Sequence, residues 1–120
     1  AASSRVSVAE WSERQLEADL DQVDLSVNAT SLGMKRSDPP LIPPHLLQPH
    51  HLVYDMVYSP RRTKLITDAE NAGARATNGL SMLLHQGAIS FETWFNLEAP
   101  LETMRDSLER ALIELEQPRT

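Results

Sequence analysis

The heptapeptide Leu52-Val53-Tyr54-Asp55-Met56-Val57-Tyr58 is the strongest strand signal in the chain. β-Branched and aromatic residues dominate it, and Ser59-Pro60 ends it with a turn signal. A helix is predicted directly afterwards, from Thr63 to Ala72, with Thr63 as its N-cap and Gly73 just beyond its C-terminal end. A buried strand followed by a short helix is the repeating unit of an α/β fold with a parallel sheet.

Strands and helices also alternate on both sides of this unit, which supports the same fold class. The apolar residues of the segment 80–95 fall nearly all round a helix, so we expect that helix to be buried against more than one neighbour. The other expected strands are Val6–Val8, Leu25–Ala29 and Ala76–Thr77, and the other expected helices are Glu10–Leu20, Leu80–Phe95 and about Leu101–Leu115.

Residues 35–50 hold five of the eight prolines. Proline lacks an N–H and fixes φ, so neither a regular helix nor a central strand is expected here. Leu41, Ile42, Leu46 and Leu47 provide apolar anchors, and an ordered loop over the sheet edge is therefore favoured over a disordered linker.

Composition describes a small acidic chain without cysteine. It has 120 residues, 17 acidic against 11 basic side chains and a net charge of −6, which argues against binding to duplex DNA or an anionic membrane. The absence of cysteine excludes disulfides and Cys-ligated zinc, and fits a cytoplasmic location.

No apolar run approaches the ~20 residues of a membrane span. The chain starts Ala1-Ala2-Ser3-Ser4, without Met or a signal peptide, which we interpret as a cut inside a longer protein.

The histidines do not have the spacing of a metal site. His50 and His51 are adjacent, and neither HExxH nor His-x₃-His occurs. We therefore expect no metal, and we interpret the histidines as solvent-exposed loop residues. The basic group Arg61-Arg62 with Lys64 is likewise interpreted as a solvated loop rather than a phosphate contact.

Three features could form a ligand site. Tyr58 falls at the carboxyl end of its strand, where ligands of parallel sheets bind, although ordinary packing with a wet hydroxyl explains it equally well. Asn78-Gly79 precedes a helix whose first N–H groups are free, although most Asn-Gly pairs are simply turns. Gln86 lies in the middle of an apolar helix, and we expect a buried amide there to need a partner such as a ligand.

Three blocks in the chain resemble the shikimate dehydrogenase family. Residues 28–34 resemble its "NATxxGM" block, residues 54–60 its "YDMxYxP" block, and residues 78–86, continuing through Phe91 to Trp94, its "NGxxMLxxQ…F…W" block. The blocks occur in the family's order and with family-like spacing, and the resemblance covers about residues 5–112.

The resemblance implies a partial Rossmann-like parallel sheet with C-terminal helices. Residues 1–78 would be the second half of an NADP-binding domain, and residues 79–120 the helices that pack toward a missing substrate domain. In the Rossmann order 3-2-1-4-5-6, strands 1 and 2 would be missing, which leaves strand 4 with a bare edge. Strands 3 to 6 would be, in order, Val6–Val8, Leu25–Ala29, Leu52–Val57 and Ala76–Thr77.

The resemblance also implies roles for individual residues. Met56 and Gly79 would line the nicotinamide side of the cofactor, with Met82 close by, and Asn28 and Thr30 would approach its ribose. Tyr58 and Gln86 would hydrogen-bond the substrate. No catalytic residue is expected in this chain, because the family's Lys–Asp pair, its glycine-rich phosphate loop and its substrate-carboxylate serines would all lie in the missing N-terminal part.

The implied activity is the reversible NADP-dependent reduction of 3-dehydroshikimate to shikimate by the full-length enzyme. The 120-residue chain alone is expected to be inactive. Its implied partners are shikimate or 3-dehydroshikimate, and either the missing N-terminal half or a second copy of itself. The alternatives are a quinate-preferring relative and a non-catalytic relative that acts as a ligand-binding or scaffold module. NADP and NAD both stay open, because the segment that reads the ribose is missing.

Overall fold

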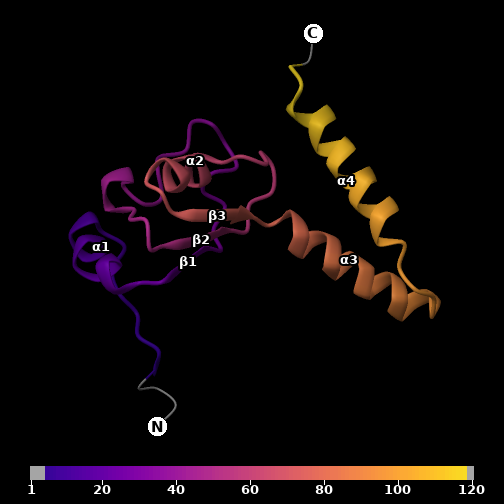
Figure 1. Cartoon of the computed structure of the whole chain (residues 1–120), viewed down its shortest axis with the longest axis horizontal. Helices are drawn as coiled ribbons and strands as arrows, with labels where there is room; N and C mark the ends of the chain where they lie inside the picture. The colour runs from indigo at the N-terminus through magenta and orange to yellow at the C-terminus, as the bar shows by residue number, and fades with distance from the viewer. Residues whose placement is uncertain (1–4, 119–120) are drawn as a thin grey trace.

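The computed structural model describes residues 5–118. They form a three-stranded parallel sheet with the order β1-β2-β3 (Figure 1). The register aligns the last residues of the three strands, so Asn28, Asp55 and Asn78 lie in one row across the sheet. The predicted parallel α/β class is confirmed. The strands are β1 (Leu25–Asn28), β2 (Leu52–Asp55) and β3 (Arg75–Asn78).

The helices follow the local signals closely. Thr63 caps α2 by accepting a hydrogen bond from the Ile66 N–H (3.3 Å). Gly73 follows the helix with a φ of +84°, a conformation that favours glycine. The helical segments are α1 (Glu13–Asp19), η2 (Leu20–Gln22), η3 (Pro44–Leu46), α2 (Lys64–Asn71), α3 (Leu80–Phe95) and α4 (Leu101–Glu116).

The core lies between the sheet, α1, α2 and the proline-rich loop. Val53 of β2 and Ala69 of α2 are fully buried in it. Ile42 and Leu47 of the loop belong to the same cluster, which confirms an ordered loop that uses apolar anchors. The other buried members of the cluster are Leu16, Leu20, Leu65 and Ala74.

His51 contradicts the expectation of solvent-exposed histidines, because its side chain is 1% exposed. Its Nδ1 accepts a hydrogen bond from the Gln48 N–H (3.0 Å), so the proton is on Nε2, which donates to the Leu20 carbonyl (2.8 Å). The ring thereby ties η2 to the start of β2. Polar residues in loops are buried where backbone groups need such partners.

Residues Val6–Val8 do not form the expected strand. They lie outside the sheet, and Val6 and Val8 are 76% and 99% exposed. A strand needs the N–H and C=O groups of a neighbour, and no strand of the described residues lies beside this segment. Residues 1–4, on which the interpretation of a cut rests, lie outside the described residues.

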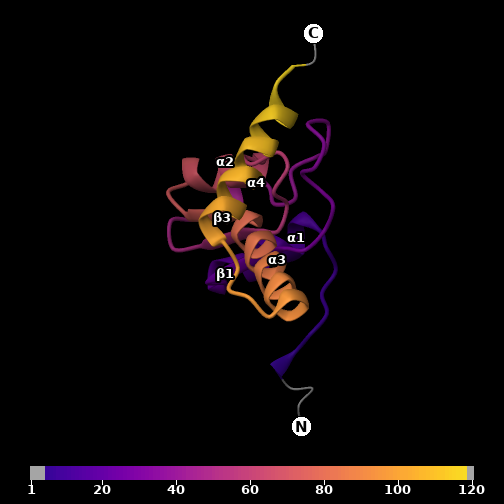
Figure 2. The same cartoon turned by 90° about the vertical axis from the view of Figure 1, so that its right-hand side faces the viewer.

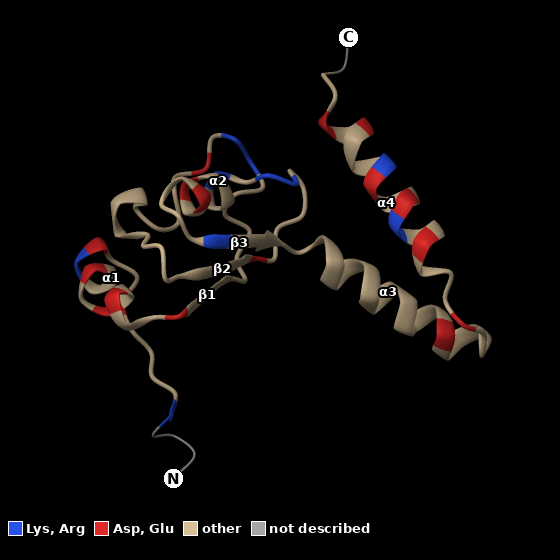
Figure 3. Cartoon of the chain, in the orientation of Figure 1, with Lys and Arg blue, Asp and Glu red and all other residues tan. Residues whose placement is uncertain are grey.

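α3 and α4 project from the sheet, as Figures 1 and 2 show: α3 leads away from β3 and α4 turns back. Figure 3 shows that α3 is almost free of charged residues. Its expected burial against several neighbours is nevertheless wrong for this chain. Only Leu84 and Ala88 of α3 are buried, whereas Trp94 is 76% and Phe95 58% exposed. No helix between residues 5 and 118 is long and apolar enough to span a bilayer.

Candidate functional site

Asp55 is the buried centre of the carboxyl edge of the sheet. Its side chain is 0% exposed. One oxygen, Oδ1, accepts hydrogen bonds from Asn28 Nδ2 (3.0 Å) and the Val57 N–H (3.1 Å). The other, Oδ2, accepts from the Thr63 hydroxyl (2.5 Å). A single carboxylate therefore joins β1, the residues after β2 and the cap of α2.

Asn28 uses all four hydrogen-bonding positions of its amide within the chain. Its Nδ2 donates to Asp55 and to the Leu32 carbonyl (2.9 Å). Its Oδ1 accepts from the Thr30 N–H (2.9 Å) and the Thr30 hydroxyl (2.7 Å). An amide side chain has two donors and two acceptor lone pairs, so Asn28 holds the loop after β1 and has no hydrogen bond left for a ligand.

Asn78 fixes the start of α3. Its Oδ1 accepts from the Leu80 N–H (3.0 Å), which satisfies one of the free N–H groups at the helix start. Its Nδ2 donates to the carbonyl of Arg61 (2.9 Å). Asn78 thus connects the loop after β2 to the first turn of α3.

Gly79 comes into close contact with the chain after β2. A Cβ at this position would lie 2.2 Å from the carbonyl oxygen of Met56, far inside van der Waals contact. The Gly79 N–H donates to the Val57 carbonyl (3.4 Å). The close approach requires glycine here and places Met56 directly against the start of α3.

A cavity of about 290 Å³ opens beside this contact. It brings together three of the predicted site residues, Thr30, Met56 and Tyr58. The Tyr58 side chain is 39% exposed, so its hydroxyl can reach a ligand. The remaining walls are formed by Ala29, Met34, Val57 and Ser59.

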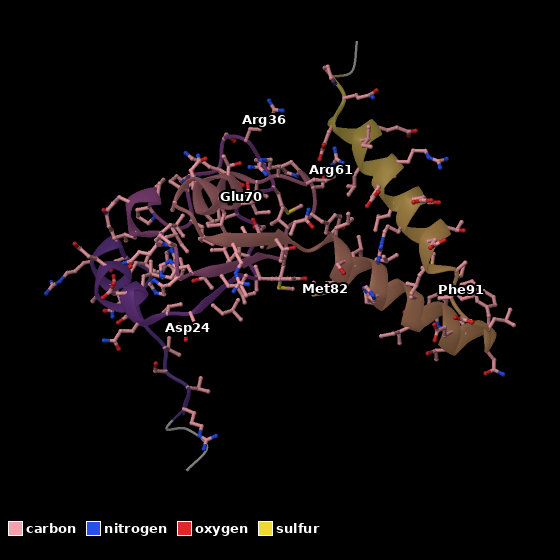
Figure 4. All side chains as sticks on the ribbon, in the orientation of Figure 1. Asp24, Arg36, Arg61, Glu70, Met82 and Phe91 are labelled. Atoms are coloured by element: carbon pink, nitrogen blue, oxygen red, sulfur yellow. The ribbon has the colours of Figure 1, made fainter. Side chains whose placement is uncertain are left out.

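Met82 and Gln86 lie on α3 and do not line that cavity. Met82 is on the first turn of α3, beside the strand ends (Figure 4), and is 42% exposed. Gln86 is exposed, so the expectation of a buried amide is wrong in this chain. Gln86 and Trp94 are both exposed because, in the described residues, few other segments pack against this part of α3.

Sequence reasoning missed two sets of residues. The sequence predicts Asp55 as part of a strand and Thr63 as a cap, although a carboxylate inside an apolar strand also indicates a buried polar cluster. The second set is Arg61 and Glu116, which are 55 positions apart and form an ion pair in which the guanidinium contacts both carboxylate oxygens. No local pattern could have revealed that pairing.

The Arg61–Glu116 pair also changes the protonation behaviour of its members. Hydrogen bonds from the Arg61 side chain and backbone hold the pKa of the Glu116 carboxyl below its usual range. Its carboxylate in turn raises the pKa of the Arg61 guanidinium. Within residues 5–118, no group of three or more His, Asp or Glu side chains is placed to hold a metal ion.

The parallel sheet, with polar side chains at its carboxyl edge and a glycine contact at the next helix, defines a Rossmann-like α/β structure. Within that class, the chain is similar over most of its length to the C-terminal part of shikimate dehydrogenases. The family model described as the shikimate 5'-dehydrogenase C-terminal domain matches residues 79–109. The resemblance seen in the sequence is confirmed.

Individual relatives give the same result. The shikimate dehydrogenase (NADP(+)) of Dehalococcoides mccartyi strain CBDB1 is 45% identical over 109 residues, which cover 90% of this chain and 38% of the relative. A crystal structure of a shikimate dehydrogenase in complex with NADP+ is similar with a TM-score of 0.75 and 34% identity, over 81% of this chain and 34% of that one. Quinate dehydrogenase from Corynebacterium glutamicum, in complex with NAD, has a TM-score of 0.74 and 30% identity, over 82% of this chain and 35% of that one. The chain thus spans little more than a third of the length of these relatives.

Proposed function

We propose that this chain is the C-terminal part of an NADP-dependent shikimate dehydrogenase, which interconverts 3-dehydroshikimate and shikimate. The observation that carries the proposal is the cavity at the carboxyl edge of the sheet, where Thr30, Met56 and Tyr58 meet beside Gly79. Ligands of Rossmann-like sheets bind at this edge. The names of the relatives supply the reaction.

The residues present suit the nicotinamide end of the cofactor. Gly79 presents backbone without a side chain, and the adjacent Met56 and Val57 give the cavity an apolar wall that a flat ring can contact. The bound nicotinamide would carry the hydride, which NADPH donates in the reduction of 3-dehydroshikimate and NADP+ accepts in the oxidation of shikimate. In this proposal Met56, Gly79 and Met82 contact the nicotinamide. Asn28 acts near the ribose by holding the loop that presents Thr30.

In this proposal the substrate binds between the NADP-binding domain and the substrate domain. Tyr58, exposed at the cavity, donates or accepts a hydrogen bond through its hydroxyl, and Gln86 on α3 supplies an amide. Residues 1–78 complete the NADP-binding domain, and residues 79–120 pack toward the substrate domain. The proton-transferring Lys–Asp pair and the pyrophosphate loop belong to the N-terminal part.

The test is a steady-state assay of the full-length protein. We expect shikimate-dependent reduction of NADP+, a marked loss of kcat/KM in Tyr58→Phe, and no loss in the matched control Tyr54→Phe, whose side chain lies within β2 and outside the cavity. Parallel assays with quinate and with NAD separate shikimate from quinate preference and NADP from NAD. No turnover of shikimate or quinate by a folded full-length protein would refute the proposal and favour a non-catalytic ligand-binding or scaffold module.

A further inference from the structure

The end of α4 is fastened to the loop after β2 by the Arg61–Glu116 pair. Glu116 Oε2 accepts hydrogen bonds from Arg61 Nη2 (3.0 Å) and Nε (3.1 Å), and Oε1 accepts from Nε (3.2 Å) and from the Arg61 backbone N–H (2.8 Å). Figure 4 shows Arg61 extending from the loop toward the end of α4. Both the side chain and the backbone of Arg61 are therefore held by one carboxylate.

The same residue is also attached to the start of α3. The Arg61 carbonyl accepts a hydrogen bond from Asn78 Nδ2 (2.9 Å), and Asn78 accepts from the Leu80 N–H. Arg61 is thus bound to both ends of the helical hairpin, to α3 through Asn78 and to α4 through Glu116. These hydrogen bonds close a ring that runs from Arg61 through Asn78 into α3, along α4 and back from Glu116 to Arg61.

The two residues assigned to the substrate lie on segments that these contacts join. Tyr58 lies three positions before Arg61 in the loop, and Gln86 lies on α3, where Gly87 faces the end of the Met104 side chain of α4. The direction in which α3 leaves the sheet sets the separation between Tyr58 and Gln86. A contact that fixes both ends of the hairpin against the loop fixes that direction.

We propose that the Arg61–Glu116 pair is a positioning device that sets the placement of Tyr58 relative to Gln86, and so the affinity for the substrate; this role rests on the proposed function. Exposed ion pairs contribute little in general. This one differs in being bidentate, in holding a backbone N–H as well, and in joining segments 55 residues apart. The neighbouring Arg62–Glu70 pair joins the same loop only to α2.

The test compares Glu116→Ala and Glu116→Gln with the control Glu70→Ala in the full-length protein. The control removes the partner of Arg62 without touching the helical hairpin. We expect Glu116→Ala to raise the KM for shikimate up to about 10-fold, which is the size of one misaligned hydrogen bond to the substrate. Glu116→Gln, which keeps an acceptor for the Arg61 N–H, should give a smaller rise, and kcat should change little because the reacting groups stay in place.

The outcomes separate the two proposals. KM does not depend on the fraction of protein that is folded, so a partly unfolded variant still reports it. An active wild type in which Glu116→Ala has the same KM as Glu70→Ala would overturn the positioning role alone. So would a loss confined to kcat and the thermal midpoint, because that is the signature of a purely structural contact. A wild type that does not turn over shikimate overturns the function and this role together.

Discussion

Asn28 and Asp55 are partners in the register of the parallel sheet, and their side chains are joined by a hydrogen bond of 3.0 Å in the buried interior. Their amide and carboxylate groups sit where two strands end and two loops begin. The loops carry Thr30 and Tyr58, which line the cavity. The shape of the site therefore depends on a polar pair that does not itself face the ligand.

Removing this carboxylate should destabilise the protein. Asp55→Ala leaves Asn28 Nδ2, the Val57 N–H and the Thr63 hydroxyl without their buried acceptor. Loss of such partners costs roughly 2–4 kcal/mol of unfolding free energy. Denaturant unfolding of the full-length protein measures the change, with the exposed Asp24→Ala as control. Equal stability of the two variants would show that the cluster is not needed for the fold.

Two glycines of the same region should respond oppositely to alanine. Gly79→Ala would push its Cβ against the Met56 carbonyl at 2.2 Å, which only a backbone shift relieves. Gly87→Ala would meet Met104 Cε at an ordinary 3.6 Å inside α3, where alanine favours the helix by up to ~1 kcal/mol. In the full-length protein, we expect a fall in thermal midpoint and in activity for the first change, and a small rise in thermal midpoint for the second. A tolerated Gly79→Ala would contradict the close approach.

Local elements could be predicted because their signals are local. The bounds of α3, the Thr63 cap and the glycine after α2 all follow from residues within a few positions of one another. The order of β1, β2 and β3 follows from the resemblance and the alternation of elements. The apolar anchors of the proline-rich loop can likewise be predicted, because they are the leucine and isoleucine residues between its prolines.

The features that the sequence does not predict depend on contacts between residues far apart in the chain. Periodicity says that α3 is apolar but not which neighbour covers it, so the expected burial of α3 and of Gln86 was wrong. Val6–Val8 has the composition of a strand but no strand beside it. His51 is buried because the Leu20 carbonyl lies next to it, and Arg61 meets Glu116 because α4 turns back; both are consequences of the tertiary fold.

The contribution of Glu116 to stability should depend on pH. The pKa of its carboxyl is lowered in the folded protein by Arg61, from a usual value of 4.5. A lowered folded-state pKa gives stability that is present above the unfolded-state value and lost as pH falls through the folded-state value. The difference in unfolding free energy between wild type and Glu116→Gln should therefore be largest above about pH 5 and vanish in more acidic solution. Glu114→Gln, on the exposed surface of the same helix, is the control. A difference independent of pH would exclude the ion pair as its source.

In the full-length protein, Gln86→Ala should weaken substrate binding and turnover more than it harms folding. The Gln86 side chain is exposed in this chain, so its removal leaves no buried group without a partner. A lost hydrogen bond from a neutral group to the substrate costs roughly 0.5–1.5 kcal/mol. Thermal midpoints without ligand, measured beside kcat/KM for shikimate, separate the two effects. A large fall in midpoint with unchanged kinetics would assign Gln86 a structural role instead.

The isolated 120-residue chain should associate with itself. β1 pairs only with β2 in the described residues, and Leu25 and Val27 along it are 53% and 51% exposed.

Unpaired strand edges recruit other chains, and the exposed Trp94 and Phe95 of α3 add an apolar surface that a second molecule can cover. We expect dimers or larger aggregates of the isolated chain by sedimentation at low micromolar concentration, and binding of a hydrophobic dye. Val27→Lys should reduce the association, because a lysine on an edge strand opposes pairing with another chain. Thr103→Lys, at an exposed position of α4 and away from both edges of the sheet, is the control for added charge. A monomeric isolated chain that unfolds cooperatively and binds no dye would show that β1 does not need a further strand.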